Sequence, residues 1–136
     1  MASYNKFNCF VEDICEKKHN LGSDTLKVAF SNAANAPSAS ADVKLTDITT
    51  VPVSNLDSVT LAVSSSVQTS GTYKLVLADK TMTASGTVGP FRYVIIYNDT
   101  AANDELIAWY DYGSEVTLAS GDTFKLDFGT ELFSLA

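Results

Sequence analysis

The chain has 136 residues, of which 46% are apolar and 18% are charged, and its formal net charge is −7. This length suits one folded domain that buries roughly two thirds of the surface exposed by its unfolded chain, and the apolar content excludes global disorder. Net negative charge, with nine basic residues that form no patch, argues against nucleic-acid binding, and no apolar run reaches the roughly 18 residues of a membrane helix.

The first twenty residues, MASYNKFNCFVEDICEKKHN, predict an amphipathic helix. Apolar residues at positions 7, 10, 14 and 21 recur at spacings of three, four and seven, which is typical of one helix face. We expect this helix to span residues 5–21, with Asn5 as its N-cap and Gly22 as its stop. His19 lies near the end of this span, where an imidazole can bond terminal carbonyl groups, so we expect it to cap the helix or to lie on the surface.

The cysteines and the N-terminal pattern indicate the compartment. Cys9 and Cys15 are six residues apart, nearly on opposite faces of a helix, so they cannot pair there and we expect free, structural thiols. Free thiols suit a reducing compartment. The N-terminus lacks a basic start, an apolar run and a small-residue cleavage site. We therefore expect the protein to stay in the cytoplasm of the cell that makes it.

The middle of the chain predicts short strands separated by polar turns. TLKVAF at 25–30 alternates and is rich in strand formers, and SNAANAPSASA at 31–41 predicts a flexible loop that contains Pro37. Residues 42–50 fit either a short helix or a strand. The segments DSVTLAVSSS, GTYKLVLAD and DKTMTASGTVG, between residues 57 and 89, favour three further strands.

The densest apolar and aromatic stretch is GPFRYVIIYNDTAANDELIAWYDYG at 89–113. It predicts strands at 91–97 and 106–112, preceded by a turn or bulge at Gly86 and Gly89 that aims the first of them. Both strands are apolar on both faces, whereas a sandwich strand needs only one apolar face. Two explanations stay open: the helix covers the second face, or part of this surface contacts another protein chain, for which Tyr, Trp and Arg are well suited.

The end of the chain predicts one more hairpin and completes the fold class. Val116 and Leu118 precede a turn at SGD, after which Phe124, Leu126 and Phe128 alternate with charged residues. Six to eight short strands follow a single helix, with no helices between them. This order predicts a mainly β protein, an antiparallel β-sandwich or jelly-roll-like single domain over residues 1–136.

Few residues could carry out chemistry. With one histidine in the chain, neither a histidine metal cage nor a catalytic triad is expected. Asp99, Asn103, Asp104 and Glu105 form one acidic cluster, but their spacing departs from that of a calcium loop, and Asp and Asn are common at hairpin tips. We therefore expect no enzymatic activity, no cofactor and no metal.

Three blocks of the sequence, taken in order, carry a resemblance. They are YNKFNCFVEDICEKKHNLGSDTLKVAFSNAANAP, SSSVQTSGTYKLVLADKTMTASGTVGPFRYVIIYNDTAANDELIAWYDYG and EVTLASGDTFKLDF. Together they resemble a family of small proteins encoded among the virion genes of tailed bacteriophages. The resemblance implies a virion structural protein, made in the bacterial cytoplasm and carried on the capsid surface as a decoration, or cement, protein of the head. It supplies no functional residues.

A decoration protein would bind the major capsid protein and bridge neighbouring subunits in many copies. Lattice symmetry favours a homo-oligomer, either a trimer or a dimer. Two alternatives are a tail, neck or fibre-associated protein and a carbohydrate-binding β-sandwich module, which often uses exposed aromatic residues. The residues expected to contact a partner are Tyr4, Lys6, Phe7, Pro37, Arg92, Tyr110 and Tyr112.

Overall fold

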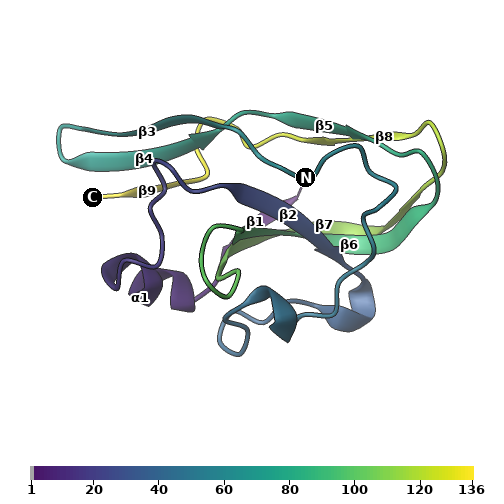
Figure 1. Ribbon diagram of the computed structural model, residues 1–136, viewed down its shortest axis with the longest axis horizontal. Helices are drawn as coiled ribbons and strands as arrows, with labels where there is room; N and C mark the ends of the chain where they lie inside the picture. The colour runs from purple at the N-terminus through teal and green to yellow at the C-terminus, as the bar shows by residue number, and fades with distance from the viewer. Residues whose placement is uncertain (1) are drawn as a thin grey trace.

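The computed structural model describes residues 2–136 and is mainly β, with antiparallel strand pairs throughout (Figure 1). The helical elements are α1 (Cys9–Cys15) and the 3₁₀ helices η1 (Ala33–Asn35) and η2 (Leu45–Asp47). The strands are β1 (Ser3–Lys6), β2 (Leu26–Ser31), β3 (Val63–Thr69), β4 (Thr72–Leu77), β5 (Lys80–Thr83), β6 (Val88–Asn98), β7 (Leu106–Leu118), β8 (Thr123–Leu126) and β9 (Phe133–Leu135). The predicted fold class, mainly β and antiparallel with one helix near the N-terminus, is confirmed.

The strands form two layers. One layer is a four-stranded sheet in the order β1-β7-β6-β2. The other contains the three-stranded sheet β3-β4-β9 and the pair β5-β8, which follow one another along the length of the molecule (Figure 1). The long hairpin formed by β6 and β7 is the centre of the larger sheet. No helix within residues 2–136 is long and apolar enough to cross a membrane.

The first core fills the space between the two layers. Phe30 of β2 and Phe91 of β6 are fully buried, and their ring centroids lie 4.7 Å apart. Phe124 of β8, in the opposite layer, meets the Phe91 ring edge-on at 5.1 Å. Edge-on aromatic pairs are favourable beyond the area they bury. These interlocking rings therefore hold the two layers together.

A bulge in β6 positions Phe91 in this core. The pairing of β6 with β7 shifts register between Val88 and Phe91, and Gly89 adopts a φ of 112°. A Cβ at Gly89 would lie 2.6 Å from the Val116 carbonyl oxygen, so both the dihedral angle and the space require glycine. The predicted bulge before this strand is present at Gly89.

A second core lies on the opposite face of the four-stranded sheet. Tyr93, Ile95 and Tyr97 point to this face, while Val94 and Ile96 between them belong to the first core. The second core consists of Phe7, Ala29, Ile48, Tyr93, Ile95, Tyr97, Leu106 and Trp109. This alternation explains why the centre of β6 is apolar on both sides.

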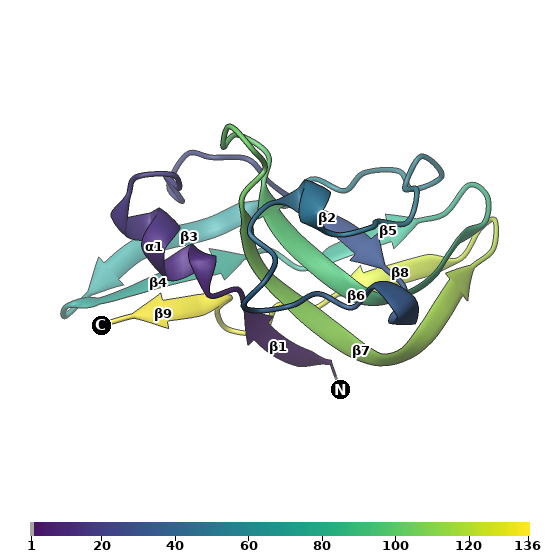
Figure 2. The ribbon, with the colours of Figure 1, turned by 90° about the horizontal axis from the view of Figure 1, so that it is seen from below.

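The connection between β2 and β3 covers the second core. Figure 2 shows this segment lying across β6 and β7. The Leu45 N–H donates to the Asp104 carbonyl oxygen at 3.1 Å, and the Leu106 N–H donates to the Val43 carbonyl oxygen at 3.0 Å. Of the helix residues, only Cys9 packs against this core. The explanation in which the helix covers the second face is therefore wrong, because the chain uses this irregular connection instead.

The N-terminal region differs from the predicted helix over 5–21. Residues 3–6 form β1, Asn8 rather than Asn5 precedes the helix, and α1 ends at Cys15 rather than near Gly22. Lys17 adopts a left-handed φ of 66°, and the Lys18 N–H donates to the Asp13 carbonyl oxygen at 2.9 Å. This bond is a Schellman-type closure, which ends a helix by satisfying its last carbonyl groups.

Residues 31–41 are not a free loop. They contain η1, the Ser38 N–H donates to Asp42 Oδ2 at 2.7 Å, and the Asn8 N–H donates to the Ala39 carbonyl oxygen at 2.9 Å. Short Ser, Asn and Asp side chains therefore satisfy the backbone of this segment locally, and its flexibility stays a prediction. The undecided residues 42–50 contain η2.

Candidate protein-binding groove

An apolar groove of about 780 Å³ lies on the open side of the sandwich. It runs between β1, an edge strand of one layer, and β9, an edge strand of the other. Each of these strands pairs on one side only within the described residues. The groove is lined by Tyr4, Lys6, Phe10, Val11, Ile14, Cys15, Tyr110, Phe128, Gly129, Thr130, Glu131, Leu132, Phe133, Ser134 and Leu135.

The groove has an aromatic floor and exposed apolar walls. Phe10 of α1 meets the Phe133 ring edge-on at 5.1 Å, and Tyr110 packs 6.2 Å from Phe128. On the rim, Val11 is 51% exposed and Leu135 is 54% exposed. Large apolar side chains that are rimmed by polar groups and open to solvent are typical of a protein-interaction surface.

Tyr4 and Tyr110 form the β1–β7 side of the groove. They are directly opposite each other in the strand register, and their rings meet edge-on at 5.6 Å. Burial, and then the neighbouring Tyr110, raise the pKa of Tyr4 to about 12, while burial and then Asp127 raise the pKa of Tyr110. Both hydroxyl groups therefore remain protonated at neutral pH and can donate hydrogen bonds.

Tyr112 extends this surface along β7. It packs 5.7 Å from Phe124 beside a smaller hollow of about 440 Å³, which Tyr110 and Phe128 also line. Of the predicted contact residues, the fold therefore brings together Tyr4, Lys6, Tyr110 and Tyr112. We call these four residues, with Val11 and Leu135, the groove surface.

The remaining predicted contact residues lie elsewhere. Phe7 is fully buried in the second core, 4.6 Å from the Trp109 ring, so it is not available to a partner. Tyr4 and Lys6 line the groove, and because side chains alternate between the two faces along an extended chain, the next residue, Phe7, points to the opposite face. Pro37 is half-buried in the connection that covers the second core and does not line the groove.

Arg92 is occupied within the chain. Its Nε and Nη2 donate to the two carboxylate oxygens of Asp111 at 2.8 and 3.1 Å, and its guanidinium lies 5.4 Å from the centre of the Tyr93 ring. The bond from Arg92 lowers the pKa of Asp111. This bidentate pair ties β6 to β7, and Arg92 does not line the groove.

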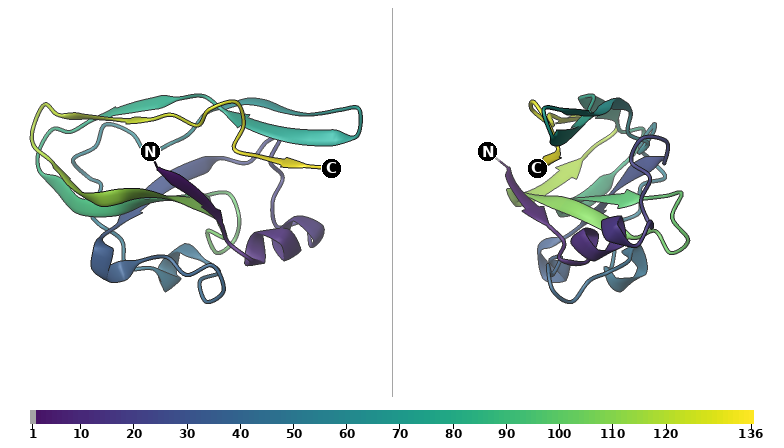
Figure 3. Two further views of the ribbon diagram at one scale, coloured as in Figure 1. Left: turned by 180° about the vertical axis from the view of Figure 1, so that it is seen from behind. Right: turned by 90° about the vertical axis from the view of Figure 1, so that its left-hand side faces the viewer.

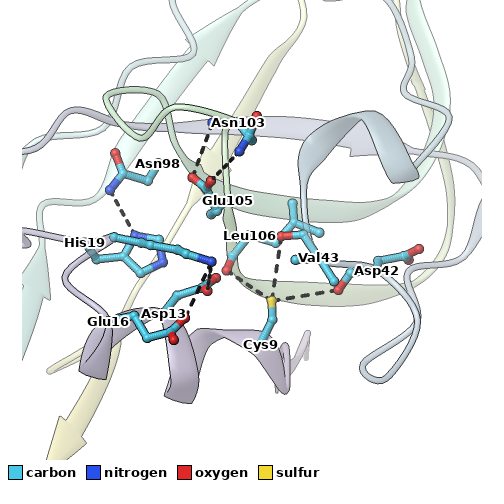
Figure 4. Close-up of polar contacts among 11 residues, drawn as sticks. Cys9, Asp13, Glu16, His19, Asp42, Val43, Asn98, Asn103, Glu105 and Leu106 are labelled. Carbon is cyan, nitrogen blue, oxygen red and sulfur yellow. Dashed lines mark hydrogen bonds and ion pairs between the residues drawn. The ribbon is translucent and has the colours of Figure 1, made fainter.

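The prediction that His19 caps the helix or lies on the surface is wrong. His19 is buried, and its Nδ1 lies 2.9 Å from Asn98 Nδ2 at the end of β6 (Figure 4). Burial lowers the pKa of His19, although the charges of Asp13, Glu105 and Asp24 oppose this effect. No local sequence pattern indicates this contact, because His19 and Asn98 are 79 residues apart in the chain.

The two cysteines are free, as predicted. Cys9 is half-buried, and its Sγ lies 3.7 Å from the Val43 carbonyl oxygen and 3.9 Å from that of Leu106 (Figure 4). Burial, and then the charge of Asp13, raise the pKa of the Cys9 thiol to about 11, so it is not a thiolate at neutral pH. Cys15 is exposed.

The acidic side chains at the tip of the β6–β7 hairpin each contact a different group. Lys27 pairs with Asp99 at 3.0 Å, Glu105 accepts bonds from Asn103, and Asp104 adopts a left-handed φ of 53° in the turn. These side chains support the hairpin rather than converge on one point. Within residues 2–136, no group of three or more His, Cys, Asp or Glu side chains could hold a metal ion.

Comparison with known proteins found no matching family model, curated protein or solved structure.

Proposed function

We propose that the protein is a structural component of a bacteriophage virion, a decoration protein that binds and stabilises the assembled head. The family resemblance supports the virion class, and the apolar groove between two open sheet edges is the observation that supports binding to another protein. The proposal assigns the protein no catalytic activity and places it on the capsid surface, in contact with the major capsid protein.

The groove suits an extended segment of the capsid protein. The free edges of β1 and β9 present unpaired backbone N–H and C=O groups, which an added strand can bond. Tyr110, Phe128 and Phe133 beneath them can accept apolar side chains of that segment. Lys6 has no ion-pair partner among the described residues and can meet an acidic group of the capsid segment.

Decoration would depend on many weak contacts acting together. A head offers many equivalent positions, and each copy that links two subunits adds to the cohesion of the shell through multivalency. A homotrimer or homodimer would match the symmetry axes of such a shell and multiply the contacts per particle. The tail and neck, in contrast, offer only one ring of positions.

The first test is the number of copies per virion, measured by quantitative mass spectrometry of purified particles against the major capsid protein. We expect hundreds of copies, as for a protein that occupies a whole shell. About a dozen copies would instead place the protein in a neck or tail ring. Complete absence from the particles would overturn the virion assignment.

The second test places the contact at the groove. Val11→Ser removes an exposed apolar side chain from the groove, and Val67→Ser makes the same change on β3, where Val67 is 57% exposed and lies outside it. We expect Val11→Ser to weaken binding to undecorated heads about tenfold, the order expected for losing one buried valine, and Val67→Ser to leave it unchanged. Equal binding by the two variants would contradict the groove assignment.

A further inference from the structure

A second pocket, of about 910 Å³, lies at the end of the sandwich beside α1. It is bounded by the turn that follows the helix, by the β6–β7 hairpin loop and by β4 and β9. It shares Ile14, Phe133 and Leu135 with the groove, and its polar residues belong to it alone. Those polar residues are Lys17, Lys18, His19, Asn20, Asp24, Ser66, Tyr73, Thr100, Asn103 and Glu105.

Asn98 determines which nitrogen of His19 carries the proton. The Asn98 Oδ1 accepts the backbone N–H groups of Thr100 and Ala101 at 3.0 and 3.2 Å, so its Nδ2 must face the other way. That Nδ2 donates one hydrogen to Asp24 Oδ2 at 2.7 Å. It donates the other to His19 Nδ1 at 2.9 Å, the contact drawn in Figure 4. Because Nδ1 accepts, the proton of the neutral imidazole is on Nε2.

The Nε2–H of His19 is a donor without an acceptor. His19 is only 8% exposed, and no protein atom of the described residues accepts a bond from its Nε2. A buried donor that lacks an acceptor destabilises the protein. A ligand oxygen in the pocket would remove this cost, so the pocket favours a ligand with an acceptor at this point.

Glu105 provides the complementary acceptor. It is 4% exposed, lines the same pocket, and receives only two long bonds, from the N–H and the Nδ2 of Asn103 at 3.4 and 3.2 Å. A carboxylate can accept about four hydrogen bonds, so Glu105 can accept more. A hydroxyl group is the simplest group that accepts from an imidazole and donates to a carboxylate.

The other walls favour a neutral ligand with an apolar face. The charged residues that line the pocket are two carboxylates, Asp24 and Glu105, and two lysines, Lys17 and Lys18, so the charges balance and favour neither anions nor cations. The rings of Tyr73 and Phe133, 5.8 Å apart, form a partly exposed aromatic wall. The volume lies in the range of small-molecule sites. A sugar ring combines several hydroxyl groups with an apolar C–H face and no charge.

We infer that this pocket binds a neutral saccharide unit, one hydroxyl of which accepts the His19 Nε2–H and donates to the Glu105 carboxylate while the sugar ring packs on Tyr73 and Phe133. The inference does not depend on the proposed binding to a capsid.

The single histidine and single tryptophan of the chain allow a direct test by nitrogen-15 NMR. Glucose, galactose, N-acetylglucosamine and rhamnose would be titrated one at a time, and the imidazole signal of His19 and the indole signal of Trp109 recorded. We expect at least one sugar to shift the Nε2 signal saturably and to leave the Trp109 signal unchanged, since Trp109 lies in the second core. If none of the four sugars does so, or if only phosphate, choline or adenosine does, the inference is wrong.

Paired variants separate the pocket from general effects on the fold. We expect Glu105→Gln to weaken sugar binding about tenfold, because a charged acceptor is replaced by a neutral one. The matched control is Glu115→Gln, at an exposed position of β7, which should leave sugar binding unchanged. Tyr73→Leu keeps the wall apolar but removes the aromatic ring, so it should also weaken sugar binding. This second variant keeps the test decisive if Glu105→Gln does not fold. Tyr4→Ser, in the groove alone, should bind sugar normally. Unchanged sugar binding by both pocket variants would overturn the assignment.

Discussion

The two faces of the β1-β7-β6-β2 sheet are both apolar, yet they are buried in different ways. One face meets a second layer of strands, and its rings interlock with Phe124 of β8. The other face meets an irregular connection that is held by isolated backbone hydrogen bonds such as Leu45 to Asp104. A strand that is apolar on both sides therefore needs no partner chain. The surface that remains open lies at the edges of the layers, along the groove.

The largest loss of stability should come from Phe91→Ala in the first core, the face that meets the second layer of strands. Phe91 is fully buried between Phe30 and Phe124. Its neighbours belong to strands of both layers, so they can move little into the cavity that the missing ring would leave. We expect a loss of about 3–5 kcal/mol in the free energy of unfolding, measured by urea denaturation. Trp109 lies in the other core, so the fluorescence of the folded variant should match that of the unaltered protein.

Phe7→Ala should lower the free energy of unfolding less than Phe91→Ala does, and it should change the fluorescence of Trp109. Phe7 is also fully buried, but its cover is a connection that can settle into the cavity. We expect a loss of about 3 kcal/mol in the free energy of unfolding, at the lower end of the range for such substitutions. Because the two rings lie 4.6 Å apart, the Trp109 emission should change in the folded state. A loss equal to that of Phe91→Ala would show that the connection is as rigid as a strand layer.

The pH dependence tests the polar end of the first core, where the His19 ring packs 5.3 Å from Phe10. Burial lowers the pKa of His19 in the folded protein below 6.5, so the unfolded chain takes up its proton first. Stability should be complete above pH 6.5 and should fall as the pH decreases through that value toward the lower folded pKa. The urea midpoint, measured between pH 5 and pH 7.5, records this loss.

His19→Gln is the control for the pH experiment, since it removes the titrating group. The variant should show a nearly flat urea midpoint over the same range. The carboxyl groups of Asp47, Asp57 and Asp111 have folded pKa values below 3.8, so their contribution is lost only at lower pH. An equal slope in both proteins would assign the pH dependence to other groups.

The smallest effect should come from Arg92→Ala at the rim of the second core. The pair with Asp111 is bidentate but partly exposed to solvent, since the two side chains are 33% and 27% exposed. Because water screens such a pair, we expect only a small loss in the free energy of unfolding, which should decrease further when salt is added. Urea denaturation at low and high ionic strength measures both effects, and a loss independent of salt would point instead to packing on Tyr93.

The strands were predictable wherever side chains alternate over five or more residues. Alternation located β2, β4, β6, β7 and β8. It missed β1 and β9, which are four and three residues long, because neither has the third apolar position with which Phe124, Leu126 and Phe128 define the alternation around β8. The helix was predicted too long because Phe7 and Leu21 match the helical spacing by coincidence and enter two different cores.

The candidate sites depended on contacts that the sequence does not encode locally. Tyr4 and Tyr110 were selected for their residue type, but only the β1–β7 register places them opposite each other. His19 and Asn98 are 79 residues apart, and no pattern in either segment indicates the other. Residue type therefore suggested part of the groove surface, whereas the pocket required the folded chain.

The positions of the two ends of the chain affect how this protein can be labelled. Both termini lie on the same side of the molecule (Figure 3), and Tyr4 and Leu135, close to them, line the groove. A purification tag or fluorescent protein attached at either end would start beside the surface that we assign to binding. The β7–β8 turn is a better insertion point, because Ser120 and Gly121 are exposed there, neither lines the groove or the pocket, and a Cβ at Gly121 would meet no atom within 4 Å.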